Sequence, residues 1–170
     1  SESSLAKGEL VSVTMPQGAP APTVGSLFRY EIMDAIRESW PPQASAVKID
    51  EIKSAAGPLI ISFDTAEDIL MHLGENTHFI DVRTAEEYIS GHVSGAKNID
   101  VAVIRSEIAT AVPEKSDVVI LYCRSGNRSN QAARMLQDMG YSVLLDAGGI
   151  ISFKGDVVQG QDPGPLPGQP

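Results

Sequence analysis

The feature that most constrains the fold is an alternation of short apolar runs with helical segments between Leu59 and Val158. Short apolar runs bounded by turn residues are typical of buried strands. Strands that alternate with helices at this spacing favour an α/β fold, in which a mostly parallel sheet carries helices on both faces. The pattern predicts strands at 59–62, 78–82, 118–122 and 143–145, and helices at 66–73, 85–90, 104–109 and 129–139.

The residues on either side of this predicted domain, 59–158, lack the alternating pattern. Residues 1–58 are predicted to form an extension, with a disordered lead-in, an amphipathic helix and a connector. The helix is expected over 26–40, because large apolar residues recur there every four positions: Phe28, Ile32, Ile36 and Trp40. We expect this helix to pack on the body of the same chain, with a dimer contact or a protein partner as the alternative. Residues 159–170 are rich in Pro and Gly and are expected to form a disordered tail.

Charge and composition limit the partners that this chain can have. Asp and Glu number 22 against 13 Lys and Arg, which gives a formal net charge of −9. Such a surface repels polyphosphate and anionic lipid, so we expect neither nucleic acid nor a membrane as a partner. No apolar run approaches the roughly 20 residues that a membrane-spanning helix needs. The single cysteine, Cys123, excludes a disulfide framework within the chain and a multi-cysteine metal site.

The most informative segment is a polar loop between a predicted strand and a predicted helix. Cys123 ends the strand, at the edge where open α/β sheets bind their ligands. Small residues after it allow backbone N–H groups to converge on one point, and the following helix adds the positive end of its dipole. Two arginines add permanent positive charge. These conditions lower the pKa of a cysteine and make it a nucleophile, so the predicted site comprises Cys123, Arg124, Ser125, Gly126, Asn127 and Arg128.

Several separated motifs resemble the rhodanese family, in the same order along the chain. They are ISFDTAEDIL, FIDVRTAEEYISGHVSGAKNID, LYCRSGNRSNQAARMLQDMGY and LLDAGGI. The resemblance is greatest to the small periplasmic single-domain members of the family. It implies a three-layer fold and a thiosulfate:acceptor sulfurtransferase that carries sulfur as a persulfide on Cys123. The donor would be thiosulfate, the acceptor a thiol or cyanide, and no cofactor would be needed. A periplasmic location is implied, with the cytoplasm as the alternative.

The resemblance also implies supporting roles for residues outside the loop. Ion pairs are expected to brace the active-site edge of the sheet, with Glu87 as a partner of Arg83, and the residues that support the site are Asp81, Arg83 and Glu87. His92, in a GH-x-x-GA motif, is expected to be structural rather than a general base. Gly148 and Gly149 are expected to form a tight turn near the loop.

Two other functions remain open at this point. Cysteine phosphatases and arsenate reductases also hold a thiolate in an anion-binding loop, but they need Cys-x5-Arg, whereas here Arg128 comes one position early and Ser129 follows it. A non-enzymatic module that binds protein partners through the same fold is the other alternative. A metal site is not expected, because His72 and His78 lack a ligand spacing with any acidic or thiol side chain.

Overall fold

The computed structural model describes residues 12–14, 27–32, 43–52, 58–73 and 76–166. The chain divides into two compact units, Ser1–Lys53 and Ser54–Pro170, and each is considered by itself. No helix among the described residues is long and apolar enough to cross a membrane.

The second unit is built on a five-stranded parallel sheet with the strand order β4-β9-β8-β5-β7. Its strands are β4 (Leu59–Ile60), β5 (Thr77–Asp81), β7 (Lys97–Asn98), β8 (Val118–Cys123) and β9 (Val143–Gly149). A separate antiparallel pair joins β6 (His92–Val93) to β10 (Val157–Val158). Since all strands of the main sheet are parallel, their carboxyl ends meet at one edge, where the loop after β8 begins.

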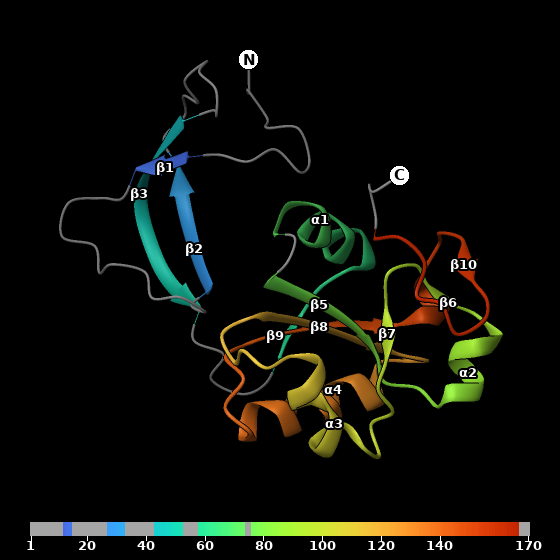
Figure 1. Ribbon diagram of the computed structural model, residues 1–170. Coiled ribbons are helices and arrows are strands. Elements are labelled where there is room, and N and C mark those ends of the chain that lie inside the picture. The colour runs from blue at the N-terminus through green and yellow to red at the C-terminus, as the bar shows by residue number, and fades with distance from the viewer. Residues whose placement is uncertain (1–11, 15–26, 33–42, 53–57, 74–75, 167–170) are drawn as a thin grey trace. The chain divides into compact units, whose positions relative to one another are not determined.

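Helices cover both faces of this sheet, as the alternating pattern predicts (Figure 1). The helix α1 lies on one face, while α3 and α4 lie on the other. Their bounds are α1 (Phe63–Leu73), α2 (Ala85–Ser90), α3 (Ile104–Ala111) and α4 (Asn127–Asp138), and a short 3₁₀ helix, η2 (Ile150–Ser152), follows β9. The predicted mostly parallel α/β fold is therefore confirmed, and the predicted strands and helices differ from the observed ones by a few residues at their ends.

Alternate residues of β8 fill the two sides of the core. Leu121 and Cys123 belong to the aliphatic cluster under α3 and α4, together with Ile104, Ile108 and Leu136. On the other face the core is aromatic, with ring centroids 5.0 to 5.5 Å apart among Phe63, Phe79, Tyr122 and Phe153. Burial of both faces explains why the strand VVILYC is a continuous apolar run rather than an alternating one.

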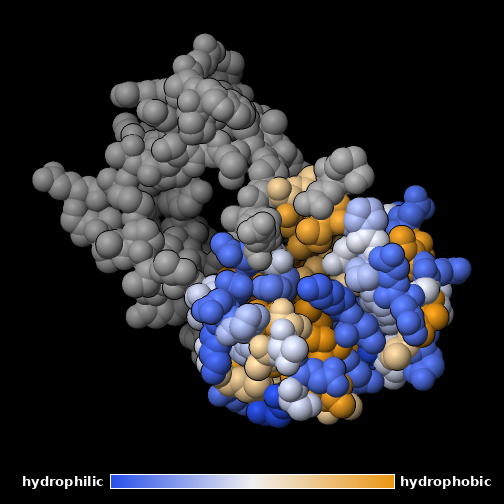
Figure 2. Space-filling model, viewed as in Figure 1, coloured by the Kyte–Doolittle hydropathy of each residue, from blue (hydrophilic) through white to orange (hydrophobic). Residues whose placement is uncertain are grey.

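The outer surface of this unit mixes charged and apolar residues. Figure 2 shows hydrophobic residues on the visible face as separate patches among hydrophilic ones. Scattered apolar side chains of this kind are normal for a folded domain.

The first unit contains a three-stranded sheet, so the predicted helix over 26–40 is wrong for part of its length. The strands are β1 (Ser12–Thr14), β2 (Leu27–Ile32) and β3 (Gln43–Ile52), in the order β1-β3-β2. β2 pairs antiparallel with β3, with Leu27 opposite Ile52. A spacing of four fits the two-residue period of a strand as well as a helical turn, so the pattern could not separate them. The expected connector likewise contains β3.

The remainder of the predicted helix, including Ile36 and Trp40, lies outside the described residues. We expected a helix to contact the chain's own body or a partner, but Leu27–Ile32 forms a strand, so no helical face exists there to make that contact.

The tail that was predicted to be disordered from residue 159 is bound to the domain as far as Leu166. The Gly95 N–H donates to the Pro163 carbonyl oxygen at 2.6 Å, and the Ser94 hydroxyl donates to the Pro165 carbonyl oxygen at 2.7 Å. Proline has no N–H, but its carbonyl oxygen accepts hydrogen bonds as well as any other. A composition rich in Pro and Gly therefore predicts disorder, whereas the carbonyl oxygens of this segment accept hydrogen bonds from the turn at Ser94 and Gly95.

Candidate active site

Cys123 is the last residue of β8, at the carboxyl edge of the parallel sheet. Its side chain is only 1% exposed and belongs to the aliphatic core cluster. The Gly126 N–H nevertheless donates to Cys123 Sγ at 3.1 Å. The sulfur atom therefore lies in apolar surroundings on one side and against a polar backbone loop on the other.

The loop solvates the sulfur in place of water. Burial by itself raises the pKa of the Cys123 thiol, but hydrogen bonds from the amide and hydroxyl of Ser129 and from the amides of Ser125 and Gly126 more than offset this effect. The net pKa of Cys123 lies below its ordinary value. These groups therefore favour the thiolate, which is the nucleophilic form.

The loop can turn this tightly because Gly126 adopts a left-handed conformation, with φ of 97°, as the N-cap of α4. A residue with a Cβ would be strained at this position. The turn directs the first amides of α4 toward the sulfur, which places the positive end of the helix dipole there.

A second glycine lets the loop lie directly on β9. A Cβ built on Gly149 would be 2.5 Å from both the Arg124 carbonyl oxygen and the Ser125 Cα. The predicted tight turn at Gly148 and Gly149 is wrong, because both residues belong to β9, where the pairing with β8 shifts register in a bulge. Absence of a side chain at Gly149 serves close backbone approach rather than a turn.

Arg128 forms a bidentate ion pair with Glu87, a residue of α2. Its Nη1 and Nη2 donate to the carboxylate oxygens of Glu87 at 2.6 and 2.8 Å. The prediction that Glu87 pairs with Arg83 is therefore wrong. A capping box explains the position of Glu87: Thr84 caps α2, and Glu87, at the third helical position, accepts from the Thr84 N–H.

The Glu87–Arg128 pair stays charged down to strongly acidic pH. The hydrogen bond from Arg128 lowers the pKa of Glu87 to about 2, against the effect of partial burial. Because this pKa is depressed, the stabilisation that it provides is present above the ordinary pKa of a glutamate and is lost only as the pH falls toward 2. The negative charge of Cys123 also contributes to the raised pKa of Arg128. Arg124, Ser125 and Asn127 are exposed around the loop.

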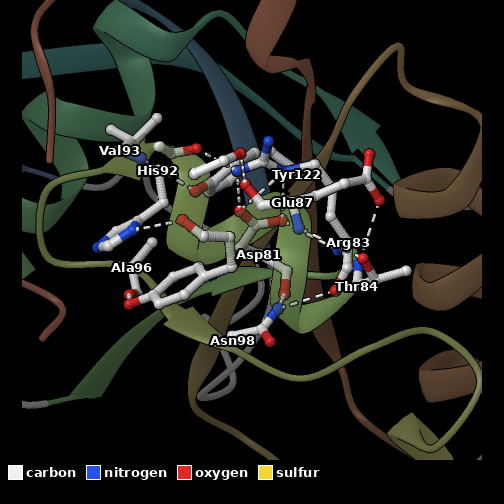
Figure 3. A network of polar contacts seen from close by, with 12 residues as sticks. Asp81, Arg83, Thr84, Glu87, His92, Val93, Ala96, Asn98 and Tyr122 are labelled. Carbon is white, nitrogen blue, oxygen red and sulfur yellow. Dashed lines mark hydrogen bonds and ion pairs between the residues drawn. The ribbon is translucent and has the colours of Figure 1, made fainter. Parts of the chain in front are cut away.

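Asp81 and Arg83 form a buried ion pair at the carboxyl end of β5 (Figure 3). Arg83 Nη2 lies 2.6 Å from the Asp81 carboxylate and also donates to the Gly91 carbonyl oxygen at 2.7 Å. The Arg83 guanidinium carbon lies 5.8 Å from the centroid of the Tyr122 ring, and the Tyr122 hydroxyl accepts from the Val93 N–H at 3.1 Å. The bracing ion pair expected from the resemblance is thus present, and it links β5 and β8 to the backbone around β6.

His92 is fully buried and is positioned as a structural residue. Its ring stacks on Tyr88, with centroids 3.6 Å apart. Its Nδ1 lies 2.9 Å from the Tyr88 carbonyl oxygen and its Nε2 lies 3.0 Å from the Asp162 carbonyl oxygen. Both ring nitrogens are therefore committed to backbone groups, which agrees with the structural role expected from the sequence.

No group of three or more metal-binding side chains occurs among the residues that the structure describes. His78 lies at the start of β5, the amino edge of the sheet, where its Nε2 is 2.9 Å from Asp117 Oδ2. It is therefore at the opposite end of the strands from Cys123.

Ser129 lowers the pKa of the cysteine but is absent from the residues that the sequence predicted for the site. Its side chain is fully buried in the first turn of α4, where its hydroxyl donates to the Gly126 carbonyl oxygen at 3.0 Å. A usable signal existed in the sequence, because a small hydroxyl residue in the first turn of a helix that follows an anion loop can donate back into that loop.

Removing one partner of the buried ion pair is expected to destabilise the fold. Asp81→Asn leaves the Arg83 guanidinium buried without its counter-charge and should lower the free energy of unfolding by about 3–5 kcal/mol. Asp138→Asn is the matched control, because Asp138 lies 3.7 Å from Arg105 with both side chains more than half exposed, and its loss should cost about 0–1 kcal/mol. Urea denaturation measures the free energy of unfolding of both variants. Equal losses would contradict a special role for the buried pair.

Adding a methyl group at the contact between the loop and β9 is expected to disturb the thiolate. Gly149→Ala forces the backbone at Arg124 and Ser125 to move, so the amides lose their geometry at the sulfur. The pH midpoint of iodoacetamide alkylation should rise by about one unit. Gly140→Ala is the control, since this residue also has a positive φ, of 92°, but lies beyond the far end of α4. It should lower stability without moving the alkylation midpoint, and an unmoved midpoint in Gly149→Ala would refute the argument.

Comparison with known proteins agrees with this geometry. The family model for the rhodanese-like domain matches residues 65–156. Thiosulfate sulfurtransferase PspE of Escherichia coli (strain K12) is 48% identical over 73 residues, covering 43% of this chain and 70% of that protein. A sulfurtransferase of Allochromatium vinosum is 38% identical over 80 residues, covering 46% of this chain and 73% of that protein. The crystal structure of thiosulfate sulfurtransferase from Pseudomonas aeruginosa has a TM-score of 0.54 at 24% identity over 60% of this chain and 20% of that one, a likeness that concerns the fold alone. The resemblance seen in the sequence motifs is confirmed, and the chain belongs to the rhodanese-like domain family.

Proposed function

We propose that this protein is a thiosulfate:acceptor sulfurtransferase that carries sulfur as a persulfide on Cys123. The observation that carries the proposal is a buried cysteine whose sulfur accepts a hydrogen bond from the Gly126 amide and whose pKa is lowered by the groups of the following loop. Such a site stabilises an anionic sulfur without a metal or an organic cofactor. The names of the relatives, thiosulfate sulfurtransferase and sulfurtransferase, support the same reaction class.

The reaction has two displacement steps at sulfur. In the first, the Cys123 thiolate attacks the outer sulfur of thiosulfate, the sulfur–sulfur bond of thiosulfate breaks, and sulfite leaves with the electron pair. In the second, a thiolate or cyanide attacks the outer sulfur of the persulfide and Cys123 leaves as a thiolate. Thiosulfate and sulfite are both dianions, so the exposed Arg124 and the partly exposed Arg128 lie where positive charge is useful.

The size of the loop favours sulfur over a phosphoryl group. Its second arginine, Arg128, follows Cys123 by five residues and is held by Glu87, while the next position is occupied by the buried Ser129. A phosphatase or arsenate reductase would need an arginine at that position to surround a tetrahedral oxyanion. A cysteine that is hydrogen bonded and has a lowered pKa also favours an enzyme over a module that only binds partners. A periplasmic location is proposed on the family resemblance alone.

Intact mass measures the proposed intermediate directly. Treatment with thiosulfate should add the mass of one sulfur atom to the protein, and a subsequent thiol or cyanide should remove it. Cys123→Ala should gain no sulfur and transfer none, while keeping the circular dichroism spectrum of the unaltered protein. Transfer that persists in Cys123→Ala, or a protein that never gains sulfur, would overturn the proposal.

A further inference from the structure

We propose that the C-terminal strap, residues 159–166, is held closed on the domain by a doubly protonated His92 and loosens when that ring loses one proton. The strap would then be a pH-sensitive part of the fold. Its closure is separate from the chemistry at Cys123, so it does not depend on the proposed function.

The His92 ring lies between two backbone carbonyl oxygens. Its Nδ1 is 2.9 Å from the Tyr88 carbonyl oxygen, and its Nε2 is 3.0 Å from the Asp162 carbonyl oxygen, which belongs to the strap. The ring is fully buried, and distances this short leave no room for a bridging water. Because a carbonyl oxygen only accepts hydrogen bonds, each contact requires a proton on the ring nitrogen.

Only the imidazolium form of the ring supplies both protons. A neutral imidazole has one N–H and one bare nitrogen, so in either tautomer a lone pair would face a carbonyl oxygen. Turning the ring over does not help, because ring carbons would then face both oxygens. The geometry therefore assigns a proton to each nitrogen of His92 while the strap is closed.

The groups around the ring suit a positive charge. The face of the Tyr88 ring lies against His92, with the planes at 10°, and the face of an aromatic ring attracts a cation. Burial and the charges of Asp81 and Asp162 raise the pKa of Tyr88 to about 12, so this phenol is neutral. Arg83, which donates to the residue before His92, is neutralised by Asp81 (Figure 3). The strand β10, which pairs with β6, contributes only valines.

Loss of one ring proton weakens the contact with the strap rather than the contact with α2. The Tyr88 carbonyl oxygen is fixed at the end of α2, where it also accepts from the Gly91 N–H at 3.0 Å, so it cannot withdraw from Nδ1. The remaining proton therefore stays on Nδ1. The bare Nε2 then faces the Asp162 carbonyl oxygen, and repulsion replaces a hydrogen bond from a charged donor.

Two glycine amides report whether the strap is closed. The Gly160 N–H donates to the Ile89 carbonyl oxygen at 2.9 Å, and the Gly95 N–H donates to the Pro163 carbonyl oxygen at 2.6 Å. These hydrogen bonds lie on either side of Asp162 along the strap. Loosening at Asp162 should therefore expose both amides to water.

The sign of the pH dependence follows from the protons that each state binds. The closed strap favours the ring with two protons, so its stabilisation is fully present at acidic pH. It is lost as the pH rises through the range in which histidine changes charge, about pH 5 to 8. This order is opposite to that of the Glu87–Arg128 pair, whose stabilisation is lost as the pH falls.

Nuclear magnetic resonance of the full chain, labelled with ¹⁵N, tests the strap without any sulfur transfer. At about pH 5 both ring nitrogens of His92 should carry protons. The pH is then raised until the ring loses its second proton. Over the same titration the protection of the Gly95 and Gly160 amides against exchange, corrected for the effect of pH on the intrinsic rate, should fall about tenfold, as expected for one lost hydrogen bond.

Two variants separate His92 from other effects of pH. His92→Gln is uncharged at every pH and should make the protection of the two amides independent of pH. His78→Gln is the matched control and should keep the full pH dependence, because His78 contacts Asp117 at the amino edge of the sheet.

Two results would overturn the proposal. One is a His92 ring with one protonated and one bare nitrogen from about pH 5 upward. The other is a ring that loses its second proton while the Gly95 and Gly160 amides keep their protection. Both are measured on the unaltered protein, so they decide the question even if His92→Gln does not fold.

Discussion

A buried sulfur holds a negative charge only if the protein replaces the water that burial removes. In this domain the replacement consists of backbone amides and one hydroxyl around Cys123, and most of the loop's unusual features follow from that requirement. Gly126 takes a left-handed conformation to direct the amides, and Gly149 has no side chain because the loop lies on its backbone. The first turn of α4 supplies the rest of the donors. None of these contacts is made with a charged side chain, so the solvation of the sulfur depends on where the backbone lies.

Two ion pairs connect α2 and the segment after it to the sheet and to α4. The Asp81–Arg83 pair is buried and reaches across to Gly91, which joins the sheet to the segment after α2. Glu87 holds Arg128 from α2 at the start of α4. The two pairs differ in kind, because the first is enclosed by the fold while the second is about one-third exposed and open to screening by salt. The first pair acts on the sheet and the segment after α2, while the second acts on the start of α4 and brings the charge of Arg128 near Cys123.

The sequence predicted those features that depend on neighbours along the chain. The helix predicted at 85–90 has the bounds of α2, and the place of Cys123 at a strand end follows from the apolar run before it. Such local signals need no knowledge of the tertiary structure. The alternating pattern also contained enough strands and helices to indicate the parallel sheet.

Features that join distant segments could not be predicted in this way. The partner of Glu87 lies 41 residues away, and nothing in the local pattern distinguishes Arg128 from the nearer Arg83. The contact of Gly149 with the loop depends on the register in which β9 pairs with β8, and this register cannot be read from the local sequence. The apolar spacing of the strand Leu27–Ile32 fits the period of a helix and that of a strand, and only its pairing with β3 decides between them.

The segment that follows β10 determines where the folded unit ends. The family model stops before β10, yet the Gly95 N–H, the Ser94 hydroxyl and His92 Nε2 all meet carbonyl oxygens of that segment. A chain shortened to Val158 would leave these groups without their partners and would uncover the turn that carries His92. The hydrogen bonds that close this domain therefore reach as far as Pro165, and a boundary taken from family similarity alone would cut through them.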